Sequence, residues 1–220
     1  MRCVMENGLF PGKLRALVLA PHTDDGEFGC GGTMARMVES KSEVYYVAFS
    51  SCDLSMPPEL PPGTLREEAR NAMQVLELPP EHLILLDYPV REFPLHRQEI
   101  LEEMIRLKHE LKPNIVFLPS RHDTHQDHQT VSQEGFRAFK DMSMLGYEVL
   151  WNNLTFPTNL FVLLEEKHLR RKIAALSCYQ SQSDRPYANE QFVRSLAVTR
   201  GTQIAACYAE VFEAIRWVWR

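Results

Sequence analysis

Short apolar runs alternate with helix-like segments along the first half of this chain. The predicted strands are Leu14–Ala20, Val44–Ser50, Leu83–Leu86 and Ile115–Leu118. The predicted helices between them are Met34–Ser40, Thr64–Leu76 and Gln98–Leu111. This alternation predicts an α/β fold whose central sheet is mostly parallel and carries helices on both faces. The 220 residues suffice for one substantial core and contain no linker, so we expect a single domain over residues 1–220.

The second half of the chain gives weaker signals. Asp123–Met142 is expected to include a helix, and Glu166–Ser177 to form another. Val149–Trp151 and Leu160–Leu164 are candidate late strands. The pattern of the ending, Ala209–Trp219, fits a strand or a helix.

Two polar clusters follow two of the predicted strands. His22-Thr23-Asp24-Asp25 comes after the first strand, and His125-Gln126-Asp127-His128 comes after the fourth. Because ligands of open α/β sheets gather at the carboxyl ends of the strands, we expect the two clusters to meet. They offer His, Asp and His as metal ligands, with a further carboxylate and imidazole beside them. That set is typical of a hydrolytic zinc site with an open coordination position.

Each cluster alone has a simpler interpretation. The first could be a polar loop in which an Asp caps the next helix, and the second a solvated loop that also contains His122. Gly29-Cys30-Gly31-Gly32 is not a dinucleotide fingerprint, because the pattern would need a glycine where Met34 stands. Those glycines favour close backbone packing beside the first cluster, and Cys30 fits a packing residue better than a nucleophile.

The composition excludes several classes of function. The net charge is -5 and no basic block occurs, which argues against nucleic-acid binding. The five cysteines are scattered without a Cys-x-x-Cys pair, which argues against a disulfide framework and favours a cytoplasmic location. Residues 1–8 are too short and polar for a signal peptide. No apolar run approaches the roughly 20 residues of a membrane span, so we expect no membrane association.

Several motifs together resemble one family. Ala20–Thr33 is similar to the first signature of the LmbE/PIG-L-type zinc-dependent N-acetylglucosamine deacetylases, and His125–His128 to their His-x-Asp-His signature. Further similarity lies in Arg66–Leu76, Leu176–Gln182, Arg200-Gly201 and Tyr208–Phe212. Glu27 resembles the Asp-Asp-x-Glu variant of bacillithiol-pathway-like members. The resemblance implies a Rossmann-like three-layer sandwich, one Zn²⁺ per chain and a homo-oligomer, either a trimer or a hexamer.

The same resemblance implies a role for each matched residue. His22, Asp25 and His128 match the zinc ligands. Asp24 matches the general base, and His125 the imidazole that stabilises the oxyanion or protonates the leaving amine. Asp127 matches a residue that orients an imidazole.

Some positions depart from the family pattern. Thr23 replaces the commoner proline, and Gly26 stands where many members have Glu. Val90 lies near the usual place of an acidic, sugar-contacting residue, which affects sugar recognition more than the metal chemistry. Arg66 and Arg91 are our predicted substrate-binding residues.

These observations lead to one main hypothesis and two alternatives. The main hypothesis is hydrolysis of the acetamide of an N-acetylated amino sugar or sugar conjugate by zinc-activated water, with release of acetate. The first alternative is a hydrolase of another small N-acyl compound or a phosphoester, which in a two-metal form would need extra ligands such as His122 and Asp123. The second is a catalytically silent carbohydrate-binding homologue, which would be expected to lose the base. Specificity is expected in the loops Ser51–Gly63 and Met144–Thr158.

Overall fold

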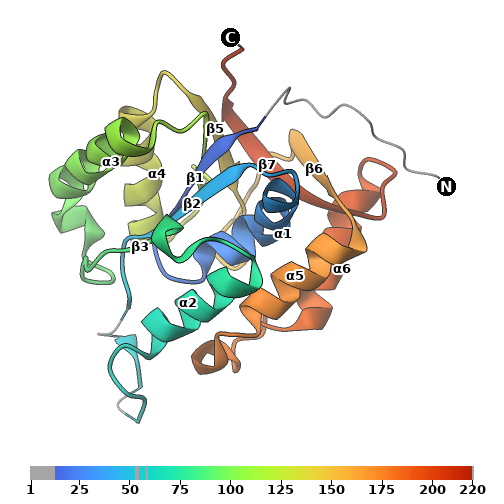
Figure 1. Cartoon of the computed structure of the whole chain (residues 1–220), viewed down its shortest axis with the longest axis horizontal. Coiled ribbons are helices and arrows are strands. Elements are labelled where there is room, and N and C mark those ends of the chain that lie inside the picture. The colour runs from blue at the N-terminus through green and yellow to red at the C-terminus, as the bar shows by residue number, and fades with distance from the viewer. Residues whose placement is uncertain (1–12, 53–54, 58, 220) are drawn as a thin grey trace.

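One seven-stranded sheet runs through the computed structural model, which describes residues 13–52, 55–57 and 59–219 (Figure 1). Residues 1–8, for which no leader was expected, lie outside this description. The strands are β1 (Arg15–Ala20), β2 (Glu43–Ala48), β3 (Leu83–Leu85), β4 (Ile115–Pro119), β5 (Ser143–Tyr147), β6 (Leu160–Leu164) and β7 (Tyr208–Arg216). The α-helices are α1 (Asp25–Glu39), α2 (Thr64–Val75), α3 (Arg97–Leu111), α4 (Gln126–Ala138), α5 (Glu166–Leu176) and α6 (Glu190–Thr202).

The sheet has the order β3-β2-β1-β4-β5-β7-β6. Strands β1 to β5 pair in parallel, and β7 is antiparallel to both β5 and β6. The chain first moves from β1 towards β3 and then returns to place β4 on the other side of β1. The gap between β1 and β4 is therefore the point where the strand order reverses, which is where open α/β sheets bind their ligands.

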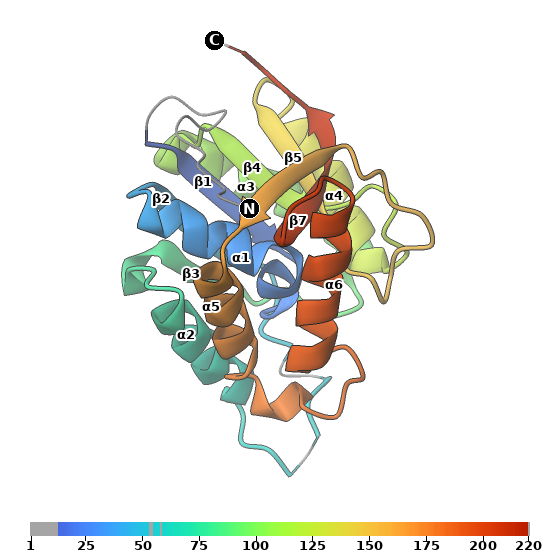
Figure 2. The same ribbon diagram turned by 90° about the vertical axis from the view of Figure 1, so that its right-hand side faces the viewer.

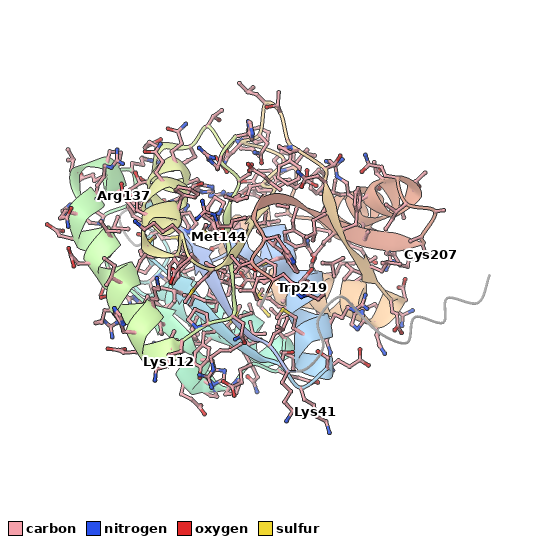
Figure 3. All side chains as sticks on the ribbon, turned by 90° about the horizontal axis from the view of Figure 1, so that it is seen from above. Lys41, Lys112, Arg137, Met144, Cys207 and Trp219 are labelled. Atoms are coloured by element: carbon pink, nitrogen blue, oxygen red, sulfur yellow. The ribbon has the colours of Figure 1, made fainter. Side chains whose placement is uncertain are left out.

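Alternate residues of β1 show how the sheet divides two cores. Ala16, Val18 and Ala20 belong to the core beneath α1, α2 and α5, whereas Leu17 and Leu19 belong to the core beneath α3 and α4. All five are fully buried, as expected for a central strand covered on both faces. Figure 2 shows α6 beside β7 and α5, and in Figure 3 Lys112 and Arg137 mark the side of α3 and α4. The predicted α/β sandwich with a mostly parallel sheet is confirmed.

Of the predictions for the second half of the chain, some are confirmed and one is wrong. Leu160–Leu164 is a strand, and the ambiguous ending forms most of strand β7. Val149–Trp151 as a strand is wrong: the strand is Ser143–Tyr147, and the residues after it turn towards the loop that follows β4. Helix α6 had no counterpart in the sequence analysis. Among the described residues, no helix is long and apolar enough to cross a membrane.

Candidate active site

Three ligand-type atoms from the two clusters form a small triangle at the β1–β4 gap. The Oδ2 atom of Asp25 lies 3.0 Å from Nδ1 of His22 and 3.1 Å from Nε2 of His128. The two nitrogens are 3.3 Å apart. Atoms bound tetrahedrally to one zinc ion at about 2.0–2.1 Å would be about 3.3–3.4 Å from one another. The triangle therefore has the size that a single metal ion needs.

Each of the two histidines is oriented by a buried carboxylate on its outer side. His22 donates from Nε2 to Oδ2 of Asp127 over 3.0 Å, and His128 donates from Nδ1 to Oδ2 of Asp123 over 2.8 Å. With the outer nitrogens protonated, the inner nitrogens of the neutral rings carry lone pairs that face the Asp25 carboxylate. Such an arrangement is stable only with positive charge at its centre, and carboxylate partners of this kind are usual behind metal-binding histidines.

The charges around the triangle also favour a cation at its centre. Burial alone disfavours a charged His128, yet the carboxylates of Asp25 and Asp123 raise the pKa of His128 to about 10. The histidines in turn hold the pKa of Asp25 well below its usual range, against the opposing effect of burial. The cluster thus stabilises a cation at its centre, either as protons or as a metal ion.

The start of α1 is shaped by close packing and not by an Asp cap. Asp24 precedes the helix, but its side chain makes no capping hydrogen bond. A Cβ on Gly26 would overlap the Tyr46 ring, and a Cβ on Gly29 the Tyr147 ring. The close packing predicted for the glycines that begin at Gly29 is confirmed there, and Gly26 adds a contact that was not predicted. The Asp24 side chain lines the cavity.

The backbone of this loop is anchored from beneath by two tyrosines. The carbonyl oxygen of Thr23 accepts from Tyr46 over 2.9 Å and from Tyr179 over 2.6 Å. Both hydroxyls also contact the carboxyl of Glu27, which is fully buried. Burial raises the pKa of Glu27 to about 8. Glu27 thus belongs to the support of the loop and not to the cavity wall.

A break in α1 is held by a buried ion pair. The backbone of Cys30 is non-helical, with φ -145°, so a second helical segment begins there. Glu210 accepts the backbone N–H groups of Gly32 and Thr33 over 2.9 and 2.6 Å, which caps that segment. Lys172 pairs with Glu210 at 2.7 Å. Cys30 itself is fully buried, as expected of a packing residue.

Asp24 has the environment of a proton acceptor. Its side chain lines the cavity. Burial, and to a smaller extent the negative charge of Asp25, raises the pKa of Asp24 to about 6. Arg185 acts in the opposite direction on the same carboxyl. A carboxylate with such a pKa can take up and release a proton near neutral pH.

His125 stands next to the triangle but is held differently. Its Nδ1 accepts the backbone N–H of Asp127 over 3.2 Å, so the neutral ring carries its proton on Nε2. Nitrogens of His22, His125 and His128 lie within 4.8 Å of one another, a looser set than the triangle that contains Asp25. Burial and the other two histidines lower the pKa of His125. His125 can therefore present an N–H donor beside the triangle.

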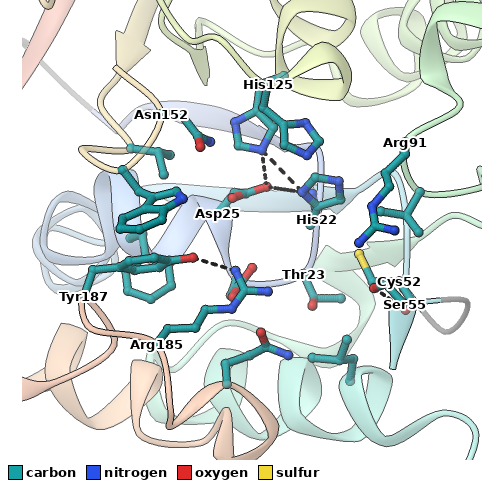
Figure 4. Close-up of a pocket in the computed structure, with 18 residues that line it drawn as sticks. His22, Thr23, Asp25, Cys52, Ser55, Arg91, His125, Asn152, Arg185 and Tyr187 are labelled. Carbon is teal, nitrogen blue, oxygen red and sulfur yellow. Dashed lines mark hydrogen bonds and ion pairs between the residues drawn. The ribbon is translucent and has the colours of Figure 1, made fainter. Parts of the chain in front are cut away.

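A cavity of 180 Å³ opens over these side chains (Figure 4). Arg91 lines the cavity with its side chain, while its backbone N–H donates to Asp127 over 2.6 Å. Arg66 is not among the lining residues. It forms an ion pair with Asp87 and donates to Oγ of Ser51 over 3.1 Å.

Several residues of the site were not predicted from the sequence. Asp123 was considered only as an extra metal ligand, whereas its carboxylate is bonded to His128 and to the backbone of His125. The unpredicted cavity-lining residues include Cys52, Trp151, Asn152, Arg185 and Tyr187. The segment Ser51–Gly63 supplies Cys52, and Met144–Thr158 supplies Trp151 and Asn152. The second segment was expected to be a loop throughout, but residues 144–147 belong to β5. Similarity to the family's Ser-Gln segment could have drawn attention to the residues just after Gln182.

Comparison with known families decides what kind of protein this is. The family model PIG-L, described as GlcNAc-PI de-N-acetylase, matches residues 17–139 and so includes both clusters. The chain belongs to the PIG-L family. The predicted family is thereby confirmed, and with it the expectation of a deacetylase-type hydrolase.

Individual relatives agree with the PIG-L assignment. The "Uncharacterized deacetylase YaiS" of Escherichia coli (strain K12) is 27% identical over 171 residues, which cover 75% of this chain and 90% of the relative. The diacetylchitobiose deacetylase of Thermococcus kodakarensis is 27% identical over 138 residues, which cover 60% of this chain and 50% of the relative. The crystal structure of the conserved protein TT1542 from Thermus thermophilus superposes with a TM-score of 0.77 at 24% identity. It covers 94% of this chain and 97% of that one, and shows that the fold is shared.

Proposed function

We propose that this chain is a zinc-dependent deacetylase that removes the acetyl group from an N-acetylated amino sugar or sugar conjugate. The observation that carries the proposal is the triangle of His22, Asp25 and His128, with the Asp24 carboxylate beside it in one cavity. The names of the PIG-L family and of the chitobiose deacetylase support an N-acetyl sugar as substrate.

His22, Asp25 and His128 would hold one zinc ion through Nδ1, Oδ2 and Nε2 respectively. When bound, zinc supplies polarisation of the amide carbonyl and a lower pKa for a water molecule. The three residues leave the cavity side open to both reactants. Asp127 and Asp123 keep the two imidazoles in the tautomers that face the centre.

Asp24 is the general base of the proposal. Its carboxyl lines the cavity, and with a pKa of about 6 it is mostly ionised at neutral pH. It accepts a proton from the attacking water and can return that proton to the leaving amine. Asp25 cannot share this role, because its Oδ2 is committed to the two histidines and to the backbone N–H of His22.

His125 stabilises the oxyanion as the acetamide carbonyl becomes tetrahedral. Its Nδ1 is occupied by the Asp127 N–H, so the group available to the substrate is Nε2–H. A positioned donor of this kind strengthens as charge develops on the oxygen. Arg91, which lines the cavity, is a proposed contact to the substrate. Arg66 as a substrate contact remains a prediction; its guanidinium is bonded to Asp87 and Ser51.

The alternative functions gain no support from the geometry. A two-metal phosphoesterase would need His122 and Asp123 as further ligands. Asp123 is instead bonded to His128 and to the His125 backbone, and His122 faces Glu213 at 3.9 Å. A silent homologue would be expected to lack Asp24 or His125. A trimeric or hexameric assembly and a cytoplasmic location remain predictions.

The proposal is tested by acetate release from a panel of N-acetylglucosamine conjugates, with the zinc content of the protein measured in parallel. We expect one zinc per chain and activity on at least one conjugate. Asp24→Asn should retain the zinc and lose activity by about 10²–10⁴-fold. The matched control is Asp141→Asn, since Asp141 pairs with Lys108 away from the cavity. Full activity in zinc-loaded Asp24→Asn, or no acetate from any conjugate, would contradict the proposal.

A further inference from the structure

Two aromatic side chains stand together at the mouth of the cavity. Trp151 lines the cavity and yet is 68% exposed. Its ring centroid lies 5.5 Å from that of Tyr187, with 36° between the ring planes. Trp151 comes from the loop after β5 and Tyr187 from the segment between α5 and α6. Two loops that are distant in sequence thus come together and form an aromatic surface in the same cavity as the triangle of His22, Asp25 and His128.

The cavity is too small for more than part of a substrate. Pockets that enclose a drug-sized ligand have volumes of about 300–1,000 Å³. The 180 Å³ here accommodates the acetamide and little beyond its own sugar. Whatever is attached to that sugar must lie at the mouth, where Trp151 and Tyr187 are.

Polar groups border the aromatic pair. Arg185 donates to the Tyr187 hydroxyl over 2.6 Å, and its guanidinium lies 5.8 Å from the Tyr187 ring centroid (Figure 4). Asn152 and Gln182 also line this cavity. A lipid chain or an apolar protein surface would leave these donors and acceptors buried without partners. A saturated sugar ring fits, because its C–H face can lie on an aromatic ring while its hydroxyls meet the polar border.

We propose that Trp151 and Tyr187 form a subsite that binds the second ring of the substrate, a sugar ring attached to the acetylated one. This inference rests on the proposed function and adds the class of its substrate, a conjugate of at least two rings. Trp151 supplies the exposed stacking face. Arg185 fixes Tyr187 through its hydroxyl.

The test compares a one-ring and a two-ring substrate, methyl N-acetylglucosaminide and diacetylchitobiose. For the zinc-loaded protein we expect a higher kcat/KM on the two-ring substrate. Trp151→Ala should lower the ratio of the two kcat/KM values by about threefold to tenfold, mainly through the KM of diacetylchitobiose. Trp151→Phe should restore most of the ratio, because it keeps an aromatic face.

The matched control is Trp219→Ala. Trp219 is 78% exposed but follows β7, whose end lies beside Ser143 at the amino end of β5. The cavity lies at the carboxyl ends of the parallel strands, on the other side of the molecule from this point. Both Trp219 and Met144 are labelled in Figure 3, and Met144 is the second residue of β5. The ratio should not change in this variant.

A second readout is independent of turnover. Addition of chitobiose, the fully deacetylated two-ring product, should change the tryptophan fluorescence of the protein, and Trp151→Phe should abolish the change while Trp219→Phe retains it. If acetate is released from both substrates but Trp151→Ala leaves the ratio and the fluorescence response unaltered, the subsite is refuted and the deacetylase stands. If Trp151→Ala changes the oligomeric mass, the surface is a contact between copies and the subsite is likewise refuted. If no acetate is released from any conjugate, the proposed function itself fails.

Discussion

The Nδ1 atom of His128 lies 2.8 Å from Oδ2 of Asp123, while Oδ1 of the same carboxylate accepts the backbone N–H of His125. One buried acidic residue thus orients a candidate metal ligand and fixes the residue at the start of α4. Asp127 does the equivalent for His22. The triangle is therefore built on two carboxylates that would not touch a metal ion themselves.

Asp123→Asn is expected to weaken zinc binding. The neutral amide lacks the negative charge of the carboxylate, so the imidazole of His128 becomes less basic and is held less firmly. The affinity for zinc should therefore fall by about 10–100-fold. Competition with a chromogenic chelator measures the affinity, with the surface variant Asp141→Asn as control. An affinity equal to that of the control would show that Asp123 does not support the site.

His125→Ala is expected to separate catalysis from metal binding. Because the Nδ1 of His125 is already bonded to the Asp127 N–H, we expect the variant to retain one zinc per chain. Loss of the Nε2–H donor should lower kcat by about 10²–10³-fold. Loss of the metal together with activity would instead assign His125 as a ligand.

The activity should depend on pH through Asp24. As the proposed base, Asp24 would act only when ionised, so kcat/KM should rise as the pH increases through about 6, the value to which burial and Asp25 bring the pKa of Asp24. A bound cation moves this limb to lower pH. Arg185 lowers the same pKa, so Arg185→Gln should shift the limb to higher pH. The exposed Arg106→Gln serves as control, and an Arg185→Gln limb that stays in place would exclude this influence.

The stability should depend on pH through Glu27. Burial raises the pKa of Glu27 from 4.5 to about 8, so in this range the folded protein retains a proton that the unfolded chain has lost. The stability that this group contributes is fully present below pH 4.5 and is lost as the pH rises through about 8. Glu27→Gln lacks this dependence, and its unfolding temperature relative to the wild type should increase between these pH values. Thermal unfolding of both proteins checks the difference, and a constant offset would contradict it.

The sequence predicted the elements whose residues carry a strong local signal. Residues 16–20 of β1 form an uninterrupted apolar run because both faces of the strand are covered. Strand β5 was missed because Ser143 and Gly146 interrupt its apolar pattern, and its pairing with β4 and β7 is decided by distant residues. Helix α6 was missed because its buried residues, Val193, Ala197 and Gly201, form only a narrow stripe of small side chains.

The part of the site that could be predicted consists of His and Asp residues that stand next to one another in the sequence. The two clusters follow strands β1 and β4, which predicted that they would meet, and the family resemblance singled out His22, Asp25 and His128. The ligand atoms of these three residues do lie together. The walls of the cavity carry no such local pattern. Arg185 and Tyr187 line the cavity from the segment between α5 and α6, and the residues around them give no clear signal of how that segment folds. Cavity walls of this kind depend on how loops from separate elements meet.

The central claim is tested most directly by a crystal structure of the zinc-loaded protein, with anomalous scattering recorded at the zinc edge. We expect one zinc ion per chain, bonded to Nδ1 of His22, a carboxylate oxygen of Asp25 and Nε2 of His128, with Asp24 and His125 outside the coordination sphere. A zinc ion bonded to His22, His125 and His128 without Asp25, or no zinc between β1 and β4, would contradict it.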